Sequence, residues 1–495
     1  MFKRLPAKRG LRRYRRWVIV ALGRGRGLRA RTKLIVALLI FAVSFAIRCL
    51  QATDVALLLG RPDQRVTSQQ ATFHTRAISI LKGGGLLIPK KLNPSDTGLL
   101  GYAPGYPIFL AAVYCLAGTD FSSAQMIQNA VNSISPALIF LISGLLISWR
   151  VGVVAGLLAA VSNHLSYYSN LLMADAPAAL PLLLAVYILI KARRFNRGAF
   201  WPYVMAGVTL SLSVWLRQNG LLLAPFIAVA LTIISARRHE AALRLAVMTG
   251  VFYLAIAPIT IRNYMIYGEF VPVGVNLGIV LWEGIGEASG DKYGAVVTDQ
   301  EVADQEAVIY NNPEYASSWA TPDGIMRDRD RIKKSLDVII NHPFWYCRVM
   351  LSRMKGMVNY HGHEPFVLKD SQLEMLEARA VSGRGFAEHL SWLRVPARAA
   401  QRVTRQTMIY FILLGAIAIT AASRRRALLI LIVPLYYLIF QSATHTEFRY
   451  TLAMHYFLFI FAAVTWVLIG SLALDGIKRL SFQIRKSERK SHEAI

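Results

Sequence analysis

Cysteine and acidic residues are scarce in this chain of 495 residues. The three cysteines, Cys49, Cys115 and Cys347, are an odd number, so at least one stays unpaired, and none has the spacing to His or Cys of a zinc site. Cysteine chemistry is therefore not the basis of function. Charged residues make up only 17% of the chain, and the 28 acidic residues are half as many as the 56 basic ones. This composition, with 55% hydrophobic residues, excludes most classes of soluble protein.

Long apolar runs are the main feature that the sequence does contain. Runs of Leu, Ile, Val, Ala and Phe recur from residue 33 to residue 474, many more than a globular core needs. We therefore expect a multipass membrane protein. The net charge of +28 could also indicate a nucleic-acid partner, but the basic residues lie in short loops between the apolar runs. This placement indicates membrane topology and attraction to anionic membrane lipids, and no nucleic-acid partner is expected.

The basic segments predict which side of the membrane each loop occupies. Residues 1–33 contain thirteen basic residues and no acid, and the stretch Trp17–Gly23 is shorter than the roughly 20 residues that a span needs. Both this tail and the basic tail 475–495 are predicted to be cytoplasmic. The predicted cytoplasmic segments hold 30 of the 56 basic residues but only four of the acids. The ten predicted spans are about 34–50, 126–148, 151–168, 171–191, 200–216, 220–235, 245–262, 407–422, 427–441 and 453–474.

Segment 105–118 decides between two topologies. If its 14 apolar residues crossed the membrane, the basic loops from Arg150 to Arg244 would face the side opposite the N-terminus. We therefore expect a juxtamembrane helix that lies in the outer interface without crossing.

Two outer segments, 51–124 and 263–404, are too long to be simple connections. In the second, the apolar spacing over Ser335–Val358 predicts a helix with a break at Pro343, leaning on the membrane. The predicted fold class is an all-α polytopic membrane protein with two outer-face segments that carry juxtamembrane helices. The predicted division of the chain is a tail at 1–33, a membrane core at 34–262 that includes segment 51–124, a large outer loop at 263–404, C-terminal spans at 405–474 and a tail at 475–495.

Five runs of residues carry a resemblance to a known family. They lie in order at Thr72–Ala77, Ala103–Pro107, Tyr167–Asp175, Arg262–Gly284 and His445–Tyr450. Together the chain resembles the membrane-embedded GT-C glycosyltransferases that use polyprenyl-phosphate sugars, and is similar to protein O-mannosyltransferases and lipid A aminoarabinose transferases. The resemblance implies a GT-C fold and transfer of a sugar from a polyprenyl-phosphate donor to a lipid, glycan or protein. It also implies that catalysis takes place on the outer face of the plasma membrane, between the two outer segments and the span ends.

The sequence departs from this family at one important position. The family places an acidic residue, its catalytic base, four positions before the aromatic that corresponds to Phe73, and this chain has Gln69 there. Because a glutamine side chain does not accept a proton, another carboxylate must serve as base in an active enzyme. Asp63 is our first choice, followed by Asp54 and Asp96, with Asp175 next. Gln69 is equally consistent with the alternative that the chain is an inactive relative of this family and acts as a scaffold.

The remaining site candidates lie at the predicted outer ends of spans. Arg217 is expected to bind the donor phosphate, because a guanidinium can bind phosphate through two hydrogen bonds. The alternative for each arginine is an interfacial anchor, and Asp175 could also cap the helix that starts near Pro177. A divalent cation is possible, although no ligand cluster supports one. The other predicted substrate-binding residues are Arg262, His445, Glu447, Arg449 and Tyr106.

A transporter or flippase of a lipid-linked sugar is the main alternative function. Transporters commonly show internal repeats and charged residues in the middle of spans, and the sequence shows neither. The sugar, the length of the polyprenyl chain and the acceptor stay open at this point.

Overall fold

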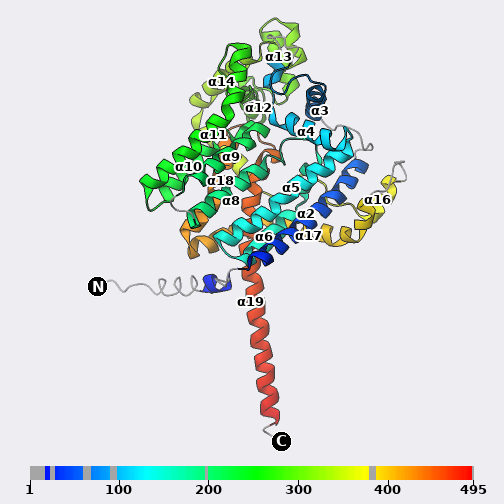
Figure 1. The fold of residues 1–495 in the computed structure, drawn as a ribbon, viewed down its shortest axis with the longest axis vertical. Helices are drawn as coiled ribbons and strands as arrows, with labels where there is room; N and C mark the ends of the chain where they lie inside the picture. Colours follow the sequence, from blue (N-terminus) through cyan, green and yellow to red (C-terminus); the bar gives the residue numbers. More distant parts are fainter. Residues whose placement is uncertain are drawn as a thin grey trace.

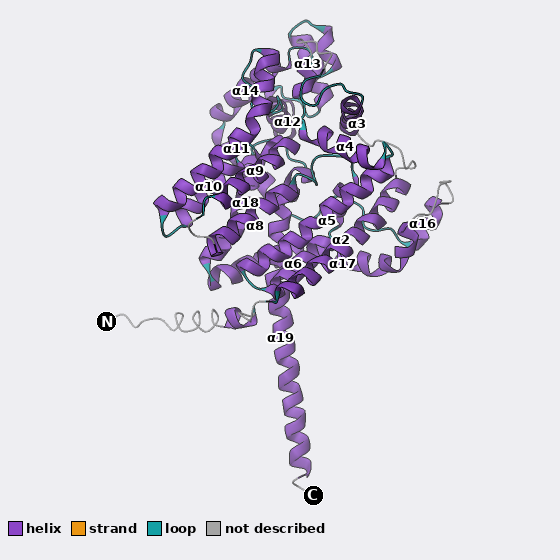
Figure 2. Cartoon of the chain, viewed as in Figure 1, coloured by secondary structure: helices purple, strands orange, loops and turns teal. Residues whose placement is uncertain are grey.

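The computed structural model describes residues 17–22, 28–58, 68–89, 97–195, 199–377 and 386–492. Within these ranges every regular element is a helix, which confirms the predicted all-α fold (Figure 2). The first helices are α2 (Ala30–Leu58), α3 (Ser68–Leu81), α4 (Gly105–Ala117), α5 (Phe121–Leu146), α6 (Trp149–Val161), α7 (Asn163–Asn170), α8 (Ala179–Phe195), α9 (Trp201–Leu216), α10 (Leu223–Ile234) and α11 (Arg238–Tyr267). The later ones are α12 (Leu277–Ser289), α13 (Asp299–Ile309), α14 (Gly324–Asn341), α15 (Pro343–Val358), α16 (Asp370–Glu377), α17 (Arg394–Ala422), α18 (Arg424–Ser442) and α19 (Leu452–His492).

The helices form a bundle with a smaller helical cap at one end (Figure 1). The cap contains α12, α13 and α14, and α3 and α4 lie beside it. Helix α19 leaves the bundle at the end opposite α13. The cap lies within segment 263–404, and α3 and α4 lie within segment 51–124, the two segments that the sequence predicts on the outer face.

Among the described residues, six helices are long and apolar enough to cross a membrane, or seven if a bent pair counts as one span. The bent pair is α6 and α7, which meet at an angle of 50°. Three other predicted spans correspond to α8, α9 and α10, which have 17, 16 and 12 residues. The multipass character is confirmed, whereas the number of ten crossings stays a prediction.

Helix ends in the bundle follow from local capping. The Asp120 carboxylate accepts a hydrogen bond from the Ser123 amide at 2.9 Å, and this starts α5 immediately after the short helix α4. The Ser162 hydroxyl accepts from the Leu165 amide at 3.2 Å and starts α7, so the chain bends at Ser162. The predicted single span 151–168 is therefore broken in two.

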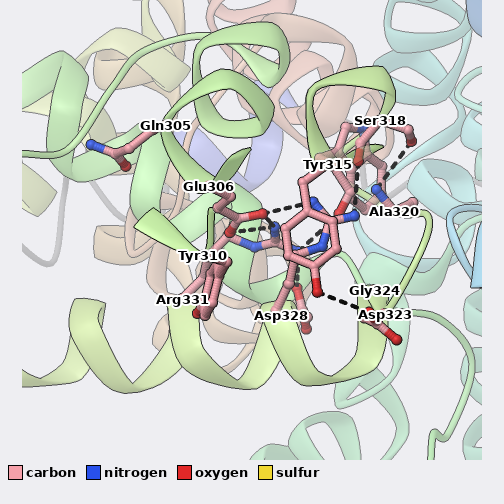
Figure 3. A network of polar contacts seen from close by, with 12 residues as sticks. Gln305, Glu306, Tyr310, Tyr315, Ser318, Ala320, Asp323, Gly324, Asp328 and Arg331 are labelled. Atoms are coloured by element: carbon pink, nitrogen blue, oxygen red, sulfur yellow. Dashed lines mark hydrogen bonds and ion pairs between the residues drawn. The ribbon is translucent and has the colours of Figure 1, made fainter. Parts of the chain in front are cut away.

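A buried ion network holds the cap together (Figure 3). Glu306 of α13 accepts hydrogen bonds from Arg327 at 2.8 Å and from Arg331 at 2.9 Å, and both arginines belong to α14. The Arg327 guanidinium also lies 4.3 Å from the centre of the Tyr315 ring. The helices predicted over Ser335–Val358 are present as the end of α14 and as α15, with the break at Pro343 as expected.

Segment 51–124 also differs from expectation at its start. Helix α2 continues to Leu58, beyond the predicted span end at residue 50, because its polar residues are buried against other helices. Asp54 forms an ion pair with Arg394 of α17 at 2.6 Å and accepts a hydrogen bond from the Leu368 amide at 2.8 Å. Later in the segment, residues 105–117 form α4 as a short separate helix, as predicted.

Candidate active site

Asp175 and Arg217 form an ion pair at the cap-side end of the bundle. Asp175 lies in the turn between α7 and α8, and Arg217 follows the last residue of α9. The Asp175 side chain is 1% exposed and that of Arg217 is 19% exposed. Because α8 begins only at Ala179, Asp175 does not cap it. Asp175 is instead held by a cation from the neighbouring helix end.

A glycine brings α4 against this ion pair. A Cβ atom at Gly105 would overlap the backbone of Trp215, so only glycine permits α4 to start this close to the end of α9. The Tyr106 ring then packs 4.8 Å from the ring centre of Phe73 in α3. The Ala-Pro-Gly-Tyr-Pro run therefore positions the outer helices around Arg217.

Two arginines share one tyrosine ring. The guanidinium carbon of Arg217 lies 4.4 Å from the centre of the Tyr450 ring, and that of Arg449 lies 5.2 Å from it. Arg449 also donates a hydrogen bond to Glu447 at 2.6 Å. Within the described part of the chain, the Nε atoms of both arginines are buried and have no hydrogen-bond partner. Two cations with unused donors therefore converge on one point.

His445 is a third cation of this cluster. Its Nδ1 lies 2.8 Å from a Glu287 oxygen, and its Nε2 lies 3.7 Å from a Glu447 oxygen. Burial alone lowers the pKa of His445, but the bonds to Glu287 and Glu447 raise this pKa to about 10. The imidazole is therefore protonated at neutral pH. Burial raises the pKa of Glu447, but His445 and Arg449 bring it down to about 2, which makes Glu447 a poor base.

Helix α12 of the cap packs against the turn His445–Tyr450. The His445 amide donates to the Val280 carbonyl at 2.6 Å, and a Cβ atom at Gly284 would overlap the His445 backbone. This contact explains the glycine of the Trp-Glu-Gly run. It also places Glu283 and Glu287 next to the His445–Tyr450 turn.

Gln69 lies in the cluster as well. Its side-chain oxygen accepts a hydrogen bond from Arg449 Nη1 at 3.4 Å. The position at which the resemblance expects an acid thus faces Arg449 in this chain. It supplies a neutral acceptor there in place of a base.

One acidic pair of the site was not predicted from the sequence. Glu283 of α12 is hydrogen-bonded to Asp299, the first residue of α13, and is 6% exposed. Burial raises the pKa of Glu283, and Asp299 raises it further, to about 8. A carboxyl pair with a pKa near neutrality is typical of groups that transfer protons. The only sequence signal was the Trp282–Gly284 run, which carried the resemblance without a role for Glu283.

Several predicted site residues lie apart from the cluster or outside the described residues. Asp63 and Asp96 lie outside them. Both carboxylate oxygens of Asp54 are engaged by Arg394 and the Leu368 amide, an arrangement typical of a structural ion pair. The Arg262 guanidinium donates a hydrogen bond to the Asn263 side-chain oxygen, and the Asn263 side-chain nitrogen donates one to the Val271 carbonyl. Tyr106 is fully buried, and its hydroxyl donates to Gln128 at 2.6 Å.

No group of three or more His, Cys, Asp or Glu side chains in the described ranges is arranged to hold a metal ion. The divalent cation considered from the sequence therefore has no assigned ligands. The three cysteines are all free thiols.

Residues 102–261 match the family model described as dolichyl-phosphate-mannose-protein mannosyltransferase. The predicted resemblance is confirmed. The matched part contains both Asp175 and Arg217, whereas the His445–Tyr450 turn lies beyond it. A comparison with curated protein sequences gave no significant match.

Solved structures show a distant likeness. The oligosaccharyltransferase of Archaeoglobus fulgidus in its apo form is 14% identical, with a TM-score of 0.48, and the match covers 92% of this chain and 52% of that one. The same archaeal enzyme, AglB, in complex with an inhibitory peptide and a dolichol-phosphate gives 13% identity, a TM-score of 0.47, and coverage of 92% and 52%. ArnT from Cupriavidus metallidurans bound to undecaprenyl phosphate is 14% identical, with a TM-score of 0.36, and the match covers 89% of this chain and 78% of that one. The chain thus spans about half the length of the archaeal enzyme.

Proposed function

We propose that the chain is a glycosyltransferase that moves a sugar from a polyprenyl-phosphate donor to an acceptor on the outer face of the plasma membrane. The observation that carries this proposal is the pair of arginines on Tyr450, each with an unused Nε donor. Such a pair suits the phosphate that leaves when the sugar is transferred. The family match over residues 102–261 supports a lipid-phosphate sugar as donor.

In this reaction the anomeric carbon of the sugar bonds to an acceptor oxygen or nitrogen, and its bond to the phosphate oxygen breaks. Arg217 and Arg449 stabilise the charge that develops on the phosphate. Asp175 and Glu447 hold these two guanidinium groups in place. The acceptor proton passes to a carboxylate, for which Asp63 is the candidate from the sequence and the Glu283–Asp299 pair is the candidate from the structure.

The topology completes the proposal. In this proposal both basic tails lie in the cytoplasm, as their charge predicts, and the cap and the α3–α4 region lie on the outer face. The donor lipid then reaches the arginines from the outer leaflet, and the acceptor approaches from the outer side. Membrane lipids surround the remaining surface of the bundle.

Mass spectrometry of envelope glycolipids and glycoproteins tests the function. Cells with the protein should carry a glycoconjugate that is heavier by one sugar than in cells without it. Arg217→Lys should restore this species only in part, because lysine keeps a positive charge for Asp175 but cannot donate two parallel hydrogen bonds to one phosphate. Arg329→Lys, which changes an exposed arginine paired with Glu269 in the cap, should restore it fully.

One observation favours a second function, a scaffold without activity, because Gln69 replaces the acid of the related family. Identical envelope profiles with and without the protein would support the scaffold. They would contradict the proposed transferase.

A further inference from the structure

A pocket lies at the opposite end of α8 and α9 from the Asp175–Arg217 pair. It has a volume of about 390 Å³ and lies between α5, α8, α10 and α18. Arg193 borders it near the end of α8, whereas Arg217 follows the far end of α9, a helix of 16 residues. At 1.5 Å per residue this helix places the two arginines roughly 24 Å apart. The pocket is therefore separate from the candidate active site.

The walls of the pocket are apolar except at one end. Leucine, isoleucine and valine side chains from all four helices line it, among them Leu189, Ile227 and Val433. The polar lining is confined to Arg193 and to the start of α18, where Ser423, Arg425 and Arg426 contribute. This division matches a molecule with a hydrocarbon chain and an anionic head.

Among the described residues, two of the three arginines at the polar end carry an uncompensated charge. Within the described ranges neither Arg193 nor Arg425 has an acidic partner, and Arg193 bonds only to the Leu231 carbonyl and the Ser235 hydroxyl, each at 3.4 Å. The two guanidinium groups repel each other, and an anion between them would offset this repulsion. Arginine also binds phosphate through two parallel hydrogen bonds.

The position of this charge indicates the source of the anion. Arg193 and Arg425 belong to basic groups that the charge distribution places in the cytoplasm. The inner leaflet is rich in anionic lipids, and basic pockets between helices on that side bind their head groups.

We propose that this pocket binds an anionic phospholipid of the cytoplasmic leaflet. Arg193 and Arg425 hold the head-group phosphate, and one acyl chain lies along the apolar walls of α5, α8, α10 and α18. The lipid then bridges helices whose ends carry like charges, and so stabilises the cytoplasmic half of the bundle.

Native mass spectrometry of the full-length protein, released from nanodiscs, tests this site. With phosphatidylglycerol the wild type should retain one lipid, and with phosphatidylcholine none. The double variant Arg193→Gln/Arg425→Gln should bind phosphatidylglycerol at least about tenfold more weakly, because it loses two charge-assisted contacts. The matched control Arg237→Gln/Arg238→Gln removes two basic residues from the same predicted face, outside the pocket, and should bind like the wild type.

A second variant separates lipid binding from folding. Leu429→Trp fills part of the apolar lining and leaves every arginine in place, so it too should lose the retained lipid. Inorganic phosphate should not raise the thermal midpoint of the detergent-purified protein, whereas phosphatidylglycerol should. Equal retention of both lipids, or equal binding by the double variant and its control, would overturn the proposal.

Discussion

At the scale of single residues, the candidate site is a set of cations that are each held by an acid. Asp175 holds Arg217, Glu447 holds Arg449, and Glu287 holds His445. These acids are buried or partly buried, so removing a cation leaves a carboxylate without its partner. Variants that keep the positive charge are therefore more informative than alanine.

Arg217→Lys should lower transfer by at least about tenfold while the protein stays folded, since the loss of one bidentate contact to phosphate costs about 1.5–3 kcal/mol. Arg217→Ala should lower both transfer and thermal stability, because the buried Asp175 carboxylate then has no cation. Transfer assays and melting curves of the two detergent-purified variants separate these effects. Wild-type transfer by Arg217→Ala would show that Arg217 is only an anchor.

The Glu283–Asp299 pair predicts a pH dependence. Since the pKa of Glu283 is raised from 4.5 to about 8, its carboxyl stays protonated at neutral pH and loses the proton as the pH rises through 8. If this pair is the base, transfer should increase through that range, and Glu283→Gln should remove the increase and lower the rate about 10²- to 10⁴-fold. The pH–rate profile of each variant is the measurement.

The alternative base gives the opposite pattern. If Asp63 is the base, Asp63→Asn should cause this loss, and Glu283→Gln should keep most of the activity. Gln69→Ala should cost far less than either change, because Gln69 contributes only a neutral acceptor to Arg449. Full activity in both Asp63→Asn and Glu283→Gln would place the base elsewhere, with Asp175 next.

At the scale of elements, the cap depends on the contact between α13 and α14. Glu306→Gln should destabilise the cap by about 3–5 kcal/mol, because Arg327 is then buried without a counter-charge and Arg331 keeps only Asp328, at 3.7 Å. Denaturant unfolding in detergent, followed by tryptophan fluorescence, measures this change. Glu314→Gln, at an exposed position in the cap, should stay within about 0.5 kcal/mol of the wild type.

The elements also show what could be predicted from sequence. Apolar spacing predicted the helices on both sides of Pro343, and the charge rule together with the length of the run predicted α4 as a separate short helix. The extension of α2 to Leu58 was not predictable, because Asp54 is polar and becomes compatible with a buried helix only through Arg394, which lies 340 residues later. The pair of Glu283 and Asp299 was missed for the same reason, since it forms only when α12 and α13 pack together.

At the scale of the whole molecule, the proposed function requires the cap and the α3–α4 region to face outward. In a variant with Cys115 and Cys347 replaced by serine, a cysteine at the exposed position Ser122 should react with an impermeant thiol reagent in intact cells. A cysteine at the exposed position His239, the second residue of α11, should react only after permeabilisation. The reverse pattern would contradict the predicted topology.

The binding of polyprenyl phosphates, assayed over a series of chain lengths, tests the central claim most directly, because the lipid phosphate is the proposed leaving group whatever the sugar. Nanodisc-embedded wild-type protein should bind them, and Arg217→Lys and Arg449→Lys should each weaken binding at least about tenfold. Arg193→Gln/Arg425→Gln, which alters only the separate cytoplasmic pocket, should bind them like the wild type. Undiminished binding by both lysine variants, or a loss confined to the pocket variant, would contradict the placement of the donor site at Tyr450.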